Sequence, residues 1–181
     1  MIITHKSFPG IKRLSLARFV ARARRELKLG GVNILLTDDC EIRDLNRTFR
    51  KKDKATDVLS FPAIPETGDE FAGDIAISVQ YAARSTERFQ LELQQELKIL
   101  ILHGLIHLSG HDHETDNGEM ARVESRLRRK LGLPTGLIAR SASGHRNGSS
   151  RPKIAQVSRR RSTISVGTSR GKTPRPKGSI R

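Results

Sequence analysis

The run from Glu92 to Leu108 reads ELQQELKILILHGLIHL, and we predict that it forms the helix on which the fold depends. Its second half is apolar on nearly every side, as expected of a central, buried helix. Gly110 is placed to end this helix, because glycine adopts a left-handed turn at low energetic cost. We therefore expect the other elements to pack around one buried helix.

Hydrophobic patterning outside this run predicts an alternation of strands and helices. Short apolar or alternating segments predict strands over residues 1–4, 32–36, 56–61 and 74–78. Helical spacing of apolar residues predicts helices over residues 16–27, from Asp38 or Asp39 to about 49, over 79–89 and over 120–131. The expected fold class is α/β (α+β), with a small mixed four-stranded sheet and helices packed around a central buried helix.

Two local features of these helices are also predicted. Gly30 and Gly31 are expected to end the helix over residues 16–27. The helix that follows Asp38 or Asp39 is expected to bury one side, and that side carries Ile42, Leu45 and Phe49.

The positive charge of the chain is concentrated at its C-terminal end. The 181 residues carry a formal net charge of +15, but residues 140–181 hold 12 Lys or Arg and no acidic residue. Residues 1–139 hold 22 basic and 19 acidic groups. Apolar periodicity stops near Ile138, and the segment beyond it cannot bury enough apolar surface to offset the entropy of ordering. We expect one domain over residues 1–138 and a basic, disordered tail over residues 139–181.

The sequence also favours a location in the cytoplasm and no membrane partner. The longest apolar run, Leu97–Leu108, has 12 residues and is interrupted by polar side chains, which is too short to span a bilayer. The N-terminus lacks the features of a signal peptide. Cys40 is the single cysteine and cannot form an internal disulfide, which fits a reducing compartment.

The segment HGLIHLSGHDH, residues 103–113, has the spacing of a metal site. His103 and His107 are four residues apart and project from one face of a helix. Gly110 lets the chain reverse, so that His113 can return toward the pair. Three neutral imidazoles leave one tetrahedral position open, as in catalytic zinc sites, and zinc can lower the pKa of its bound water to roughly 7. We predict one zinc ion per chain, with the zinc-bound water as a catalytic group; the alternative is that these are core or solvated histidines.

The same spacing occurs in the metzincin proteases, which carry the pattern HExxHxxGxxH. In those enzymes the glutamate takes a proton from the zinc-bound water. The corresponding residue here is Gly104. Peptide hydrolysis is therefore disfavoured.

The loop over residues 50–57 is rich in basic side chains. Arg50 offers a planar guanidinium that suits a phosphate, and we predict it to be catalytic and substrate-binding. Lys52 and Lys54 are the other predicted substrate-binding residues; a solvated turn is the alternative.

The chain has no Trp, one Tyr and six Phe. If the phosphate belongs to a nucleic acid, we therefore expect contacts to its backbone and shape rather than base stacking.

Several of these motifs together resemble the YbeY family of bacterial endoribonucleases, also called rRNA maturation factors. The resemblance covers about residues 30–132. It rests on Leu45-Asn46, on RKKDKATDVLSFP over residues 50–62, on Gly73-Asp74-Ile75, on residues 103–113 and on Glu119-Met120 with Glu124. The family usually has Tyr where this chain has His111, so His111 could compete with His113 as third ligand.

The resemblance implies a single-domain α/β fold with a small mixed sheet, and zinc held in a cleft by the three histidines that match the motif. It also implies a single-strand-specific, metal-dependent endoribonuclease in late 16S rRNA 3′-end maturation and in ribosome quality control. The implied partners are precursor 16S rRNA, the small ribosomal subunit and its assembly factors. Arg50 matches an arginine regarded as functionally needed beside the zinc.

Two other functions stay open at this point. One is a ribosome assembly factor that binds RNA without cutting it and whose zinc is structural, since zinc stabilises a fold in either case. The other is a zinc hydrolase of another substrate. For the nuclease, the sequence does not decide between direct attack of zinc-bound hydroxide on phosphorus and activation of the 2′-hydroxyl.

Overall fold

The computed structural model describes residues 1–4, 6–63, 71–89, 91–112 and 116–134. His113 and the predicted tail over residues 139–181 lie outside these described residues, as does the predicted domain end near Ile138. Within these residues the chain forms four strands and five helices.

Four strands form one mixed sheet, as predicted. In chain order they are β1 (Ile2–Thr4), β2 (Gly31–Thr37), β3 (Val58–Pro62) and β4 (Phe71–Ser78). Their order across the sheet is β1-β2-β4-β3, with β1, β2 and β4 parallel and β3 antiparallel to β4. Strand β3 is therefore an edge strand.

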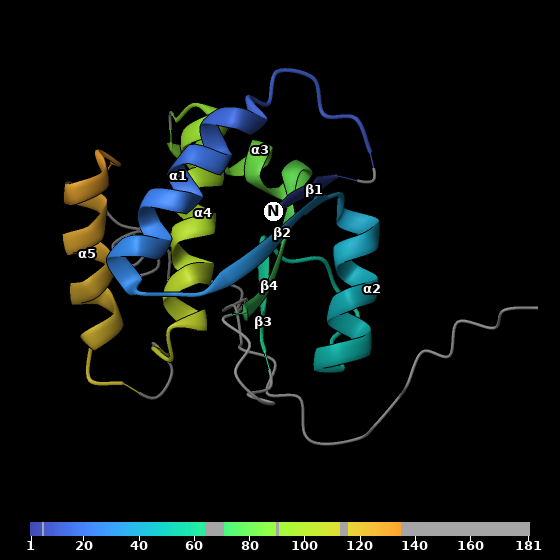
Figure 1. Cartoon of the computed structure of the whole chain (residues 1–181). Coiled ribbons are helices and arrows are strands. Elements are labelled where there is room, and N and C mark those ends of the chain that lie inside the picture. The colour runs from blue at the N-terminus through green and yellow to red at the C-terminus, as the bar shows by residue number, and fades with distance from the viewer. Residues whose placement is uncertain (5, 64–70, 90, 113–115, 135–181) are drawn as a thin grey trace, which may run out of the picture.

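Five helices cover the two faces of the sheet. They are α1 (Arg13–Leu27), α2 (Asp39–Arg50), α3 (Val79–Phe89), α4 (Leu93–Leu108) and α5 (Glu119–Leu131). Figure 1 shows α1, α4 and α5 on one side of the sheet and α2 on the other. Helix α4 packs against α1, α3, α5, β3 and β4, and nearly all of its side chains from Glu96 onward are buried. The predicted central buried helix is confirmed.

The alternation of side chains along the strands divides the core into two parts. Ile34 and Ile75 point toward α4 and belong to the larger cluster, which includes α1, α3 and α5. Leu35 and Ala76 point the other way and pack with Ile42 of α2 in a smaller cluster. Both faces of the sheet are covered, so its central strands consist mainly of apolar residues.

Helix α4 approaches the sheet closely at Gly104. A Cβ atom at this position would lie 2.9 Å from Cδ1 of Ile75 and 3.1 Å from Oγ of Ser60. Ser60 Oγ also donates a hydrogen bond to the carbonyl oxygen of Gly104 at 3.4 Å. Position 104 therefore faces the sheet and has no room for a glutamate side chain.

Most element positions agree with the sequence-based expectation, but α1 is not ended by the predicted glycine pair. Its last residue is Leu27, and the residue that follows, Lys28, takes the left-handed conformation at φ 54°. The amide of Leu29 donates to the carbonyl of Arg24 at 3.0 Å, and the Leu29 side chain packs against the core. This is the bonding of a Schellman cap, whose apolar contact outweighs the backbone cost at Lys28. Gly31 instead begins β2.

The predicted buried side of α2 is partly wrong. Ile42 is fully buried, but Phe49 is 47% exposed and contacts the ring of Phe61 edge to face, with ring centroids 5.1 Å apart. Asn46 is buried instead, because its Nδ2 donates to the carbonyl oxygen of Lys54 at 2.7 Å. A hydrogen bond to a loop carbonyl thus offsets the cost of burying a polar side chain. The spacing of apolar residues along the helix does not predict such a bond.

We predict that Gly73→Ala is strongly destabilising. Gly73 has φ +140°, and an added Cβ would lie 2.3 Å from the carbonyl oxygen of Phe61. Backbone strain and overpacking should together lower the free energy of unfolding by more than about 2 kcal/mol, measured by urea denaturation. Gly132→Ala is the control, because Gly132 also has a positive φ but has open space around it, so about 1 kcal/mol is expected. Equal losses in both variants would contradict the close approach of β3 to β4.

Candidate metal centre

Two of the predicted zinc ligands meet inside the fold. His103 and His107 lie one turn apart on α4, and each is only 5% exposed. Their Nε2 atoms are 3.2 Å apart, and the rings meet edge to face at 83°. The sequence prediction that these two imidazoles share one face of a helix is therefore matched by the geometry.

The other ring nitrogen of each histidine is held by an acceptor. His103 Nδ1 donates to Oε2 of Glu124 on α5 at 3.2 Å. His107 Nδ1 donates to the backbone carbonyl oxygen of His111 at 2.9 Å. An ionised carboxylate and a carbonyl can only accept, so each neutral ring carries its hydrogen on Nδ1. Both Nε2 atoms consequently present a lone pair.

The carboxylate behind His103 is itself fixed by an arginine. Glu124 and Arg128 are each 1% exposed and lie one turn apart on α5. Arg128 Nε donates to Glu124 Oε1 at 2.8 Å, Nη2 donates to the same oxygen, and Nη1 donates to the carbonyl oxygen of Pro134 at 3.1 Å. Burial by itself would raise the pKa of Glu124. The hydrogen bond with His103 and the charge of Arg128 outweigh burial and hold that pKa below its ordinary value.

This arrangement fits a metal ion. Two lone pairs that face each other across 3.2 Å repel unless a proton or a cation lies between them. Two nitrogens at zinc–nitrogen distances of about 2.0–2.1 Å and a tetrahedral angle would be about 3.3 Å apart. Zinc-binding histidines commonly donate their second nitrogen to a carboxylate or a backbone carbonyl, as His103 and His107 do here. The pair is thus preorganised for a small cation.

The third predicted ligand, His113, lies outside the described residues. Within the described part of the chain, no three His, Cys, Asp or Glu side chains gather in a way that could hold a metal ion, so His111 does not complete a triad with the pair. The Nδ1 of His111 lies 3.0 Å from Oγ of Ser109 at the end of α4. His113 therefore stays a predicted ligand.

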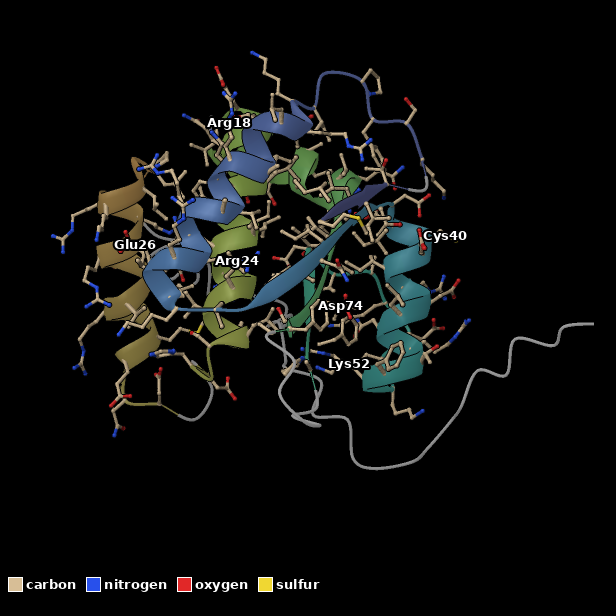
Figure 2. All side chains as sticks on the ribbon, in the orientation of Figure 1. Arg18, Arg24, Glu26, Cys40, Lys52 and Asp74 are labelled. Atoms are coloured by element: carbon tan, nitrogen blue, oxygen red, sulfur yellow. The ribbon has the colours of Figure 1, made fainter. Side chains whose placement is uncertain are left out.

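The predicted substrate-binding loop begins at the C-terminal end of α2. Arg50 is the last residue of that helix, and Lys51 follows it in a left-handed conformation. The side chain of Asp53 contacts α2, because its carboxylate accepts hydrogen bonds from Nε and Nη2 of Arg43 at 2.8 Å and 2.9 Å. The C-terminal ends of α2 and α4 lie toward the same side of the molecule, and Lys52 lies near that side (Figures 1 and 2). The roles of Arg50, Lys52 and Lys54 beside the histidines stay predictions.

Arg128 was not predicted as a functional residue from the sequence, and Glu124 was assigned no role. Arg128 appeared as one of several basic residues near the end of an amphipathic helix, where exposed cations are common. The available signal was the spacing of four between Glu124 and Arg128, together with the place of both on the side of the helix that carries Met120 and Leu127.

Comparison with known proteins extends the motif resemblance along most of the chain. A family model described as Endoribonuclease YbeY matches residues 11–132. A protein of Koribacter versatilis named Endoribonuclease YbeY is 50% identical over 154 residues, which cover 84% of this chain and 99% of that protein. One of the same name from Solibacter usitatus is 48% identical over 143 residues, covering 78% of this chain and 95% of that protein. The solution structure of TM1509 from Thermotoga maritima matches with a TM-score of 0.50 and 25% identity, covering 83% of this chain and 100% of that one.

We predict that Arg128→Met destabilises the protein even without metal. The change keeps the length and helix propensity of the side chain but leaves the Glu124 carboxylate buried without its guanidinium partner. The free energy of unfolding, measured by urea denaturation, should fall by about 3 kcal/mol. Arg129→Met alters an exposed neighbour on the same helix and should change stability by no more than about 0.5 kcal/mol. Similar stabilities for the two variants would show that the buried pair does not hold α5 in place.

Proposed function

The chain belongs to the endoribonuclease YbeY family, and from this premise we propose that it cleaves single-stranded RNA with the help of one zinc ion. The ligands in this proposal are His103, His107 and His113. The observation that carries it is that the Nε2 atoms of His103 and His107 lie 3.2 Å apart, each on a ring whose other nitrogen is hydrogen-bonded. When bound, zinc acts as a Lewis acid that polarises a phosphoryl oxygen and makes a water molecule acidic near neutral pH.

The chain's own residues have distinct tasks in this proposal. Glu124 and Arg128 fix the plane of the His103 ring, and the carbonyl of His111 fixes that of His107. Because these partners are buried or part-buried, the rings hold one orientation before any ligand binds. Arg50 would bind a phosphate oxygen of the substrate through its planar guanidinium. Lys52 and Lys54 would add positive charge along the bound RNA strand.

The proposed substrate is precursor 16S rRNA near its 3′ end, and the proposed partners are the small ribosomal subunit and its assembly factors. This part of the proposal rests on the family resemblance of the motifs. The composition agrees with it, because a chain with a net charge of +15 is attracted to a polyanion. Among the described residues, no helix has the length and hydropathy needed to cross a bilayer.

The burial of the histidine pair favours a second function, in which a metal ion is structural. His103 and His107 lie within the most buried helix, so a metal ion there would also stabilise the fold. A ribosome assembly factor that binds RNA without cutting it would need no more than this. A peptidase is disfavoured, since the sheet leaves no room for a catalytic glutamate at position 104.

The proposal is tested by RNA cleavage with the full chain and a His107→Ala variant. A single-stranded RNA carrying the 3′ end of precursor 16S rRNA is incubated with each protein, with zinc or with a chelator. Loss of a ligand should lower the cleavage rate at least about a hundredfold, because a metal ion contributes several kcal/mol to transition-state stabilisation. Chelation should have the same effect on the parent chain.

His111→Ala is the matched control, because it removes a neighbouring imidazole while the backbone carbonyl that accepts from His107 stays in place. It should cleave at close to the parent rate. Cleavage that survives both the chelator and His107→Ala would overturn the zinc mechanism. If no variant cuts while all bind the RNA, the assembly factor is the better description.

A further inference from the structure

A basic hollow lies between α1, α4 and α5, apart from the histidine pair. Its volume is about 440 Å³. Four of its lining residues are cations, Lys12, Arg18, Arg22 and Lys98, and the described residues that line it include no acidic side chain. The hollow is therefore a concentrated patch of positive charge.

The fold holds these cations in fixed relation to one another. Arg18 and Arg22 are one turn apart on the exposed side of α1, and Figure 2 shows Arg18 projecting from that helix. Such neighbours have Cβ atoms about 5–6 Å apart. Lys98 reaches the hollow from α4, with its Nζ 6.0 Å from the centre of the Phe19 ring. Packing of α1 on α4 thus places guanidinium and ammonium groups around one depression.

The charges of this hollow are not neutralised within the described part of the chain. There, none of the four cations has a carboxylate oxygen within 4.0 Å. Elsewhere on the surface, Arg43 pairs with Asp53, Arg84 with Asp39 and Lys130 with Glu26. A cluster of like charges costs folding free energy, so an external anion would relieve it.

The hollow is separate from the metal centre. Lys98 and His103 are five residues apart on α4, which places them about 140° apart around the helix axis. His103 faces Glu124 in the first half of α5, whereas the hollow is closed by Leu131 at the end of α5. A ligand in the hollow would not touch the histidines.

We propose that this hollow binds the phosphate backbone of an RNA strand whose cleavage takes place at the metal centre. The choice of RNA rests on the proposed function. An RNA strand bound both in the hollow and at the metal centre would be held at two places, which orients the segment to be cut. Arg18, Arg22 and Lys98 contact phosphates and contribute affinity without reading sequence.

The composition of the hollow favours RNA over an acidic protein. Leu14 is the one large apolar side chain lining it that is strongly exposed, at 66%. A specific protein interface buries roughly 1,200–2,000 Å² and has an apolar centre, which a single leucine does not provide. Phe19 is buried beneath Lys98 and offers no face for a base. Binding should therefore be electrostatic and independent of base sequence.

The test measures RNA binding by the full chain with Arg18→Gln, Arg22→Gln and Lys98→Gln combined. Dissociation constants for single-stranded poly(U) and for a mixed-sequence RNA are measured from 50 to 300 mM salt by fluorescence anisotropy. For single strands, each phosphate contact contributes about 0.7 to the slope of log K against log salt, so the slope should fall by about two. Affinity at 100 mM salt should weaken at least about tenfold for both RNAs.

A charge-matched control combines Arg25→Gln, Arg126→Gln and Arg129→Gln, three exposed cations that do not line the hollow. An equal loss of RNA affinity in both triple variants would mean that only net charge matters, and would overturn the proposal. Unchanged RNA affinity in the first triple variant would also overturn it. The double variant of Arg18 and Arg22, both exposed, repeats the test if the triple variant does not fold. Since binding is measured without cleavage, a failure of the proposed nuclease activity leaves this result interpretable.

Discussion

Two imidazole lone pairs face each other across 3.2 Å in the interior of the protein, and much of the surrounding structure serves to hold them there. Neither ring can turn away, because the carboxylate of Glu124 and the carbonyl of His111 fix the Nδ1 hydrogens. The carboxylate is fixed in turn by Arg128. Burying an ion pair and two polar rings costs desolvation free energy. A cation bound between the rings would stabilise the fold and offset part of that cost.

The close approach of α4 to the sheet gives this arrangement its rigidity. Gly104 lets the helix backbone pack against Ile75 and Ser60, and the adjacent His103 then reaches Glu124 on α5. The histidines are thus built on a regular helix in the core rather than on a loop, and regular elements position functional groups more precisely. The basic hollow uses the same scaffold, because α1 and α5 both pack on α4.

Much of the fold could be predicted because its signals are local or periodic. The central helix followed from a segment that is apolar on nearly every side, and the paired histidines from a spacing of four residues. Features decided by a tertiary partner were missed. Phe49 is exposed and Asn46 buried because a loop carbonyl reaches Asn46, and Arg128 is buried because Glu124 lies one turn before it. The cap of α1 was assigned to the wrong residues because the apolar contact of Leu29, and not a glycine, determines it.

The most direct test of the metal centre is a crystal structure grown with zinc, with anomalous diffraction data collected on both sides of the zinc absorption edge. We predict one anomalous peak per chain, about 2.0–2.1 Å from Nε2 of both His103 and His107, with a further ligand from beyond the described residues. The Nδ1 contacts to Glu124 and to the carbonyl of His111 should be unchanged. Zinc bound elsewhere, or no peak between two Nε2 atoms that instead share a proton, would contradict the assignment of this pair as a metal site.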